Sequence, residues 1–226
     1  MADGYPTVPD GRLDDGDWRL RARTEETLFR TPAAAVVGRT LVYEDGALAD
    51  ALAAAGTADV LARASAGRTD DGSRLVDTGD GDYWRFFFAT ALSFRPPLAP
   101  GIGPASMLPT VRSEALSAFA DDLTARGFAD VDRGRSQRVR TEGGDRARLT
   151  KITATLPLGT DAPADTLDVE GWVAVWTTGG EFRIAGGAYP VAGLDDLLAA
   201  VPADERPPTG RTAARDDLLA LVRAVT

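Results

Sequence analysis

The chain of 226 residues contains no cysteine and no histidine. Without cysteine it has no disulfide, no thiolate nucleophile and no sulfur-ligated metal. Without histidine it has no Ser-His-Asp triad and no imidazole acid–base catalysis, and most transition-metal sites are excluded. A Ser-Lys arrangement would need the single lysine, Lys151, and no Ser-x-x-Lys pattern lies near it. Whether the protein is an enzyme therefore stays open; we expect no cofactor, and no catalytic residue can be named.

Lysine and glutamate are scarce as well. One of the 25 basic residues is a lysine and eight of the 34 acidic residues are glutamates, so arginine and aspartate carry nearly all of the charge. The formal net charge is −9. An excess of surface carboxylates keeps proteins hydrated and soluble in concentrated salt. We therefore expect a protein of a salt-adapted, halophilic organism.

Long hydrophobic runs are also missing. No stretch approaches 18 uninterrupted apolar residues, and residues 1–17 lack the apolar core of a signal peptide. We therefore expect a cytoplasmic protein without membrane association. Residues 1–16 are polar and aperiodic, so we expect a flexible N-terminal lead-in followed by a single domain over residues 17–226.

Residues 82–94 alternate with a period of two, which is typical of a β-strand. One face of this strand is strongly apolar and carries Trp84, Phe86, Phe88, Leu92 and Phe94. The opposite face is smaller and mostly apolar as well. Because both faces need to be covered, we expect this strand in the middle of a sheet with packing on both sides.

Weaker periodic patterns predict the remaining elements. Further strands are expected from Trp18 onward and over residues 34–43, 128–140, 146–156, 167–178 and 181–188. Helices are expected over residues 46–55, 57–67, 110–126, 193–201 and 212–225, the last of them after a polar linker at 202–211. Asp45 and Gly56 are the expected caps of the first helix, and Gly179-Gly180 predicts a two-residue hairpin turn. This order predicts an α+β fold, a single mainly antiparallel twisted sheet with helices packed on at least one face.

The most basic part of the chain is residues 126–151. It has eight basic and four acidic residues, a net charge of +4, and the rest of the chain then carries −13. If residues 141–145 form a five-residue loop, Arg140 lies opposite Arg146 and Arg138 lies opposite Arg148. A two-residue Gly-Gly turn would set an apolar residue against an arginine, so the hydrophobic pattern favours the longer loop. Four arginines are then predicted on one face of a hairpin.

Two interpretations of this arginine cluster stay open. Like charges directly opposite each other destabilise a sheet, and an anionic ligand would offset the repulsion because the arginine fork suits phosphate and carboxylate. Alternatively, neighbouring aspartates or concentrated salt neutralise the cluster, and it is a solvated surface. Nucleic acid is the less favoured anion, because such binding weakens steeply with salt and Phe128 is the one aromatic residue in this stretch.

A second constellation lies in the predicted hairpin of residues 172–189. With Gly179-Gly180 as the turn, Trp176 lies opposite Arg183, and Trp172 lies opposite Gly187, where a glycine leaves room for the indole. The Trp176 and Arg183 pair is placed for a cation–π contact worth about 0.5–2 kcal/mol, or to line a ligand groove. The simpler interpretation is a packing face covered by the C-terminal helices.

The aspartate-rich residues 77–82 resemble a calcium loop in composition only. With Asp77 in the first position, the third and fifth positions are Gly79 and Gly81, which supply no side-chain oxygen. Asp-Gly pairs are also ordinary turn signals. We therefore expect no metal site.

These observations leave three functional hypotheses. The leading one is a non-catalytic binding or assembly protein that contacts a protein partner through a sheet face or the C-terminal helices. The alternative is a protein or enzyme that binds a small anion, phosphate or carboxylate, through Arg138, Arg140, Arg146 and Arg148. The third is a nucleic-acid binder. None of the three includes a membrane.

Overall fold

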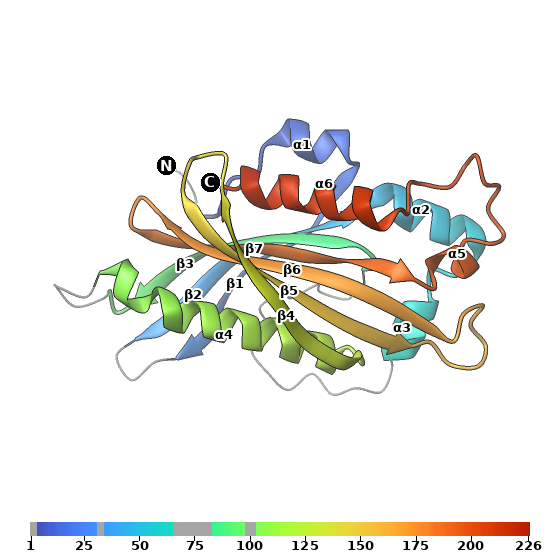
Figure 1. The fold of residues 1–226 in the computed structure, drawn as a ribbon, viewed down its shortest axis with the longest axis horizontal. Helices are drawn as coiled ribbons and strands as arrows, with labels where there is room; N and C mark the ends of the chain where they lie inside the picture. The colour runs from blue at the N-terminus through green and yellow to red at the C-terminus, as the bar shows by residue number, and fades with distance from the viewer. Residues whose placement is uncertain (1–3, 31–33, 66–82, 98–102) are drawn as a thin grey trace.

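The computed structural model describes residues 4–30, 34–65, 83–97 and 103–226. They form one seven-stranded sheet in the order β1-β2-β3-β7-β6-β5-β4, in which every neighbouring pair is antiparallel (Figure 1). The strands are β1 (Trp18–Arg30), β2 (Ala35–Asp45), β3 (Phe86–Arg95), β4 (Ala129–Arg140), β5 (Arg146–Pro157), β6 (Thr166–Thr178) and β7 (Glu181–Ala192). The α+β fold with a single antiparallel sheet is confirmed.

Helices pack on both faces of this sheet. They are α1 (Asp10–Asp15), α2 (Gly46–Ala55), α3 (Val60–Ser65), α4 (Pro104–Ala125), α5 (Leu194–Leu197) and α6 (Arg211–Ala224). In Figure 1, α1 and α6 lie above the sheet and α4 lies below it. Because α4 connects β3 in the sheet interior to β4 at the edge, it has to cross the sheet face, and it contacts β6 and β7 on the way.

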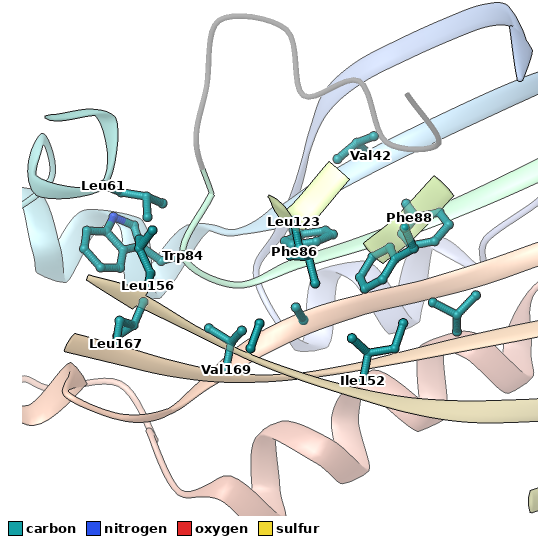
Figure 2. Packing of buried hydrophobic residues seen from close by; sticks show 14 of the residues in the cluster. Val42, Leu61, Trp84, Phe86, Phe88, Leu123, Ile152, Leu156, Leu167 and Val169 are labelled. Atoms are coloured by element: carbon teal, nitrogen blue, oxygen red, sulfur yellow. The ribbon is translucent and has the colours of Figure 1, made fainter. Parts of the chain in front are cut away.

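Each face of the sheet has its own hydrophobic core. Under α4, Phe119 stacks on Phe88 with the ring centroids 5.8 Å apart. Figure 2 shows part of this first core cluster, with Phe86 and Phe88 of β3 on the same side of the sheet. Under α6, a second core cluster contains Phe87 and Trp172. β3 is therefore buried on both faces, as its sequence predicts, although the strand itself begins at Phe86.

Two local signals are confirmed in detail. The Asp45 side chain accepts a hydrogen bond from a backbone N–H in the first turn of α2, and Gly56 ends that helix in the left-handed conformation. Gly179 and Gly180 both have positive φ angles, of 58° and 88°, and form the two-residue turn between β6 and β7. Positive φ is the conformation that glycine adopts without a steric penalty.

α4 begins six residues earlier than predicted, at Pro104 instead of Thr110. Pro104 occupies the start of the helix, where the missing N–H has no intrahelical partner to lose. Pro109 lies inside the helix and removes one backbone hydrogen bond. Side chains on both sides of it, Leu108 and Val111, pack in the first core cluster. Tertiary packing therefore stabilises a helical turn that Pro109 makes unfavourable locally.

The two ends of the described chain meet beside α1. Thr7 and Thr226 exchange two backbone hydrogen bonds, of 2.9 and 3.1 Å, and Val8 is buried in the second core cluster. A flexible lead-in was expected over residues 1–16, and within it the structure forms the short helix α1. The segment is held by contacts with β1, by the Arg12 and Glu142 ion pair and by the hydrogen bonds to Thr226, most of which the local sequence does not indicate.

The C-terminal helices also differ in part from the prediction. α5 spans Leu194–Leu197, which is shorter than residues 193–201, and α6 is close to residues 212–225. The apolar side of α6, with Leu218 and Val222, is buried against the sheet. The linker before α6 therefore does not carry that helix away from the domain.

Residues 77–82, with their calcium-like composition, lie outside the described residues. Among the helices that are described, none combines the length and the apolar character needed to cross a membrane.

Candidate functional site

The β4–β5 hairpin sets four arginines in two opposing pairs. Arg138 pairs with Arg148 and Arg140 pairs with Arg146, on either side of a five-residue loop at 141–145. The first and last residues of this loop are joined by a backbone hydrogen bond, from Thr141 N–H to the Asp145 carbonyl at 3.0 Å, and Asp145 N–H donates to the Thr141 hydroxyl at 3.0 Å. The register is the one that the hydrophobic pattern of the sequence predicts.

All four arginines are exposed and lie on the α4 face of the sheet. The strand period of two places Arg146 and Arg148 on the same side as Ile152, which packs in the first core cluster under α4. The intervening Ala147 and Leu149 point to the other side and pack in the second core cluster. One side of β5 therefore changes along its length from an arginine-bearing surface to a buried apolar face.

No carboxylate neutralises this cluster within the part of the chain that the structure describes. Arg140 donates from Nη1 to the backbone carbonyl of Gly144 at 3.1 Å, which is an uncharged partner. The side chains of the other three arginines form neither an ion pair nor a hydrogen bond with the described residues. Glu142, the glutamate of the loop, instead accepts from Arg12 of α1 at 2.9 Å. One of the two acidic side chains of the loop is thus engaged elsewhere, and the other, Asp145, forms no ion pair with the four arginines among the described residues.

A fifth arginine joins the cluster from α4. Burial and the positive charge of Arg148 both lower the pKa of Arg112. The Nε atom of Arg112 is buried, and it has no hydrogen-bond partner among the described residues. We refer to Arg112, Arg138, Arg140, Arg146 and Arg148 together as the arginine surface.

Of the four other basic residues of the 126–151 stretch, three have partners elsewhere in the fold. Arg126 is buried, and its guanidinium lies 5.5 Å from the centre of the Phe86 ring. Arg133 donates to the Ser117 hydroxyl of α4 at 3.0 Å. Lys151 points to the opposite face of the sheet, toward α6. The net charge of this stretch is therefore spread over both faces. Among the described residues, its basic side chains without an ion pair or hydrogen bond are Arg135, Arg138, Arg146 and Arg148.

Lys151 belongs to a buried polar cluster around Glu170 on β6. Glu170 is 3% exposed, and its Oε1 atom accepts from Lys151 Nζ at 2.7 Å and from Arg211 of α6. Its Oε2 atom accepts from Tyr189 Oη at 3.2 Å, and Tyr189 in turn accepts from Trp172 Nε1. Burial raises the pKa of Glu170, the hydrogen bonds from both cations lower it, and the net shift is downward. The only lysine of the chain thus holds a carboxylate and is not a free nucleophile.

Sequence comparison identifies a family for this chain. Residues 5–226 match the family described as "Domain of unknown function (DUF6517)", which is nearly the whole chain. The chain belongs to the DUF6517 family. No curated protein matches its sequence. Since the family description names no activity, the arginine surface and the Glu170 cluster are what this DUF6517 protein offers for a functional interpretation.

The predicted Trp176 and Arg183 pair forms in register but does not make a groove in this DUF6517 protein. The two residues face each other across β6 and β7, and Trp176 is completely buried in the second core cluster. Arg183 donates to Glu181 at 3.0 Å. The cation–π contacts among the described residues do not include this pair. The packing interpretation, with a face covered by α6, is the one that fits.

Gly187 lies opposite Trp172, as predicted, and its lack of a side chain also matters for contacts outside the hairpin. A Cβ atom at Gly187 would collide with the backbone carbonyl oxygen of Phe86 on β3 and lie 2.9 Å from Leu218 Cδ1 of α6. Glycine is therefore required by the approach of a strand and a helix. Hairpin register alone could not reveal this contact, because neither neighbour belongs to the hairpin.

Sequence reasoning missed Arg112 and Glu170 as members of these clusters. Arg112 joins the arginine surface only because α4 crosses the sheet face beside β5. Glu170 follows Asp168 in a chain with 34 acidic residues, so its burial has no distinct local signal. Both cases depend on which helix covers which strand.

Proposed function

We propose that this DUF6517 protein binds a small multivalent anion, with phosphate or carboxylate groups, on the arginine surface. The observation that supports the proposal is that five arginines from three elements gather on one face without a carboxylate partner among the described residues. Like charges at opposing strand positions destabilise a sheet. An anion that is held by several of these guanidinium groups removes that repulsion when it binds.

The proposal concerns binding and not catalysis. Arginine is protonated at any physiological pH, so it offers charge and hydrogen bonds but is a poor acid or base. Its planar fork binds a carboxylate or phosphate through two parallel hydrogen bonds. Bidentate bonds of this kind compete with simple salt ions better than a point charge does. This supports an anion site in a protein that we also propose to be adapted to concentrated salt.

Binding of a protein partner through the C-terminal helices has less support. That hypothesis depends on an apolar helix that is free to dock elsewhere, and the apolar side of α6 is buried in its own second core cluster. Arg211 also joins the start of α6 to Glu170 on the sheet. We therefore place this hypothesis, and nucleic-acid binding, behind the small anion.

The test is a thermal-unfolding series with inorganic phosphate and with citrate, in 0.2 M and 2 M potassium chloride. A ligand held at 100 times its dissociation constant stabilises the fold by about 2.7 kcal/mol, which is a rise in Tm of roughly 5–10 °C for a chain of this size. We expect such a shift in the wild type for at least one of the two anions. The double variant Arg138→Ala/Arg148→Ala should lose it.

The matched control is Arg63→Ala/Arg95→Ala. It removes the same two charges at exposed positions where each arginine is paired, with Asp59 and Glu25. The control should keep the shift of the wild type. An equal shift in all three proteins would mean that the anions act on the whole surface, and the proposal would then be wrong.

A further inference from the structure

The arginine surface also indicates which class of anion fits it. We infer that the ligand is a chain of at least two linked phosphates, as in pyrophosphate or triphosphate, recognised by its phosphates alone. This inference rests on the proposed function, and it adds the chemical class of the ligand. Its basis is the spacing of the arginines, the directions from which they come, and the side chains beside them.

The spacing requires an extended or multiply charged ligand. Opposing residues of an antiparallel pair have Cα atoms about 4.5–5.5 Å apart, and residues two apart on a strand are separated by about 6.6–6.8 Å. Arg138, Arg140, Arg146 and Arg148 therefore stand at the corners of a rectangle. A single acidic group pairs with one or two of these arginines, whereas two or three linked acidic groups extend far enough to pair with all four.

The directions of approach favour phosphate over carboxylate. Arg138 and Arg140 stand on β4, Arg146 and Arg148 stand on β5, and Arg112 of α4 is close enough to Arg148 for the charge of Arg148 to lower its pKa. A carboxylate is planar and presents two oxygens, which suits one bidentate arginine. A phosphate is tetrahedral and presents three outer oxygens, so it accepts hydrogen bonds from several directions at once. Arginines on three neighbouring elements therefore suit a phosphate better than a carboxylate.

The charge of the arginine surface also favours linked phosphates. Within the described residues, the surface has five unneutralised positive charges, and Arg112 has a lowered pKa in part because of Arg148. A chloride ion compensates one of them. A phosphate group carries about −1.5 to −2 at pH 7, so two or three linked phosphates compensate most of the surface in one binding event.

Within the described hairpin, no side chain beside the arginines offers a stacking surface for a base. The hairpin, residues 129–157, contains no aromatic side chain on which a base could stack. Three hydroxyls near the hairpin are already engaged, because Ser136 and Thr150 bond to each other at 2.9 Å and Ser117 accepts from Arg133. Free polyphosphate and the phosphate chain of a nucleotide would thus be bound through the same groups.

The experiment is isothermal titration calorimetry of the full chain in 0.5 M potassium chloride without divalent cations. The probes are pyrophosphate, tripolyphosphate, orthophosphate, citrate and ATP. Additional charge-assisted hydrogen bonds should make pyrophosphate bind at least about tenfold more tightly than orthophosphate or citrate. ATP should bind as tightly as tripolyphosphate, within about threefold, because its base and sugar make no contact.

Two variants test the role of the fork. Arg138→Lys/Arg148→Lys keeps the charge but loses bidentate bonding, and it should weaken pyrophosphate binding about tenfold. Arg112→Gln should weaken it as well, since it removes the third direction of approach. Arg63→Lys/Arg95→Lys is the matched control and should bind as the wild type does. Retained pyrophosphate affinity in the Lys variant would mean that only the charge matters, and the geometric inference would fail.

The remaining outcomes separate the inference from the proposed function. If citrate binds as tightly as pyrophosphate, the anion site stands and the phosphate class is wrong. If ATP binds more than about tenfold more tightly than tripolyphosphate, a base or sugar is recognised and the ligand is a nucleotide. If none of the five probes binds, both the inference and the proposed function fall.

Discussion

Glu170 is the buried carboxylate that links the start of α6 to the sheet. It is buried, and it accepts hydrogen bonds from Lys151 on the neighbouring strand, Arg211 on α6 and Tyr189 on β7. Removing one member of a buried charged group is costly because the others keep their charge without compensation. The cost is reduced here because Lys151 and Arg211 retain contact with water.

We predict that Glu170→Gln lowers the free energy of unfolding by about 1–3 kcal/mol at pH 7. The pKa of Glu170 is lowered in the folded protein, so its contribution is present above the unfolded pKa of about 4.3 and is lost as the pH falls through the folded value. The difference in stability between wild type and variant should therefore shrink below about pH 4. Urea unfolding from pH 7 to pH 3 measures this.

The control for this experiment is Glu114→Gln, an exposed residue on α4. It removes the same charge without disturbing a buried cluster and should leave the stability within about 0.5 kcal/mol of the wild type. A Glu170→Gln penalty that stays constant down to pH 3 would show that the carboxylate charge does not cause it.

Tyr189 provides a second test of the same cluster from the alkaline side. Burial raises the pKa of Tyr189 to about 12. A tyrosine that ionises less readily when folded destabilises the fold as the pH rises past its unfolded pKa of about 10. We predict that the wild type loses stability between pH 10 and about 12, and that Tyr189→Phe lacks that part of the loss. Circular dichroism across this range measures both proteins.

Among the elements, β7 is approached closely by its neighbours at two adjacent glycines. β6 lies against Gly186, and β3 and α6 lie against Gly187. A Cβ atom at Gly186 would collide with the carbonyl oxygen of Trp172, and one at Gly187 with that of Phe86. These neighbours are backbone atoms, which cannot move aside as a flexible side chain can. The central part of the sheet therefore has almost no tolerance for larger residues at these positions.

We predict that Gly187→Ala destabilises the protein by more than about 2 kcal/mol, because the strands β3 and β7 would have to separate. Gly134→Ala on the edge strand β4 is the control. Its Cβ atom would meet only ordinary contacts with Lys151, at 3.5 Å or more. Thermal unfolding of both variants measures the effect, and equal Tm values would contradict the role assigned to the close backbone approach.

In the β4–β5 hairpin, we predict a substitution that increases the stability of the protein. In the absence of a ligand, Arg148→Ala should stabilise the protein by about 0.2–1 kcal/mol in 0.1 M potassium chloride, because it removes a like-charged cross-strand pair. In 2 M salt the Debye length is below about 3 Å and the gain should vanish. Arg63→Ala, which removes a paired arginine, should give no gain at either concentration. Destabilisation by Arg148→Ala at low salt would mean that the pair is compensated.

For the molecule as a whole, the distribution of charge matters more than its net value of −9. The arginine surface is locally basic, and the rest of the chain is strongly acidic. Self-repulsion among surface carboxylates opposes the compact state and is screened by salt. This screening of carboxylate repulsion is the physical reason for the proposal that the protein is adapted to concentrated salt.

We predict that raising potassium chloride from 0.1 M to 2 M increases the Tm by about 5 °C or more, equivalent to a gain of roughly 1–2 kcal/mol. Sucrose stabilises proteins by exclusion from their surface, without screening charge. A series in sucrose alone at low salt is therefore the comparison. The Arg148→Ala variant should show almost the same rise in Tm with potassium chloride as the wild type, reduced only slightly. A Tm that is independent of potassium chloride would contradict the proposed adaptation.

The fold class and several contacts could be predicted from the sequence because they depend on neighbours along the chain. The doubly buried β3, the caps Asp45 and Gly56, the turn at Gly179-Gly180 and the pairing of Arg138 with Arg148 all follow from period, turn chemistry and hairpin register. Within one hairpin, a single register satisfies the hydrophobic pattern, so opposing residues are determined locally.

Only the tertiary structure decided which helix covers which strand. The entry of Arg112 into the arginine surface, the burial of Glu170 beneath α6 and the early start of α4 at Pro104 each depend on contacts between elements distant in sequence. Local propensity differs by about 1 kcal/mol or less between most residues, whereas burying one large side chain contributes about 1.5–3 kcal/mol. Packing between distant elements therefore overrides local preference at the positions that complete the candidate site.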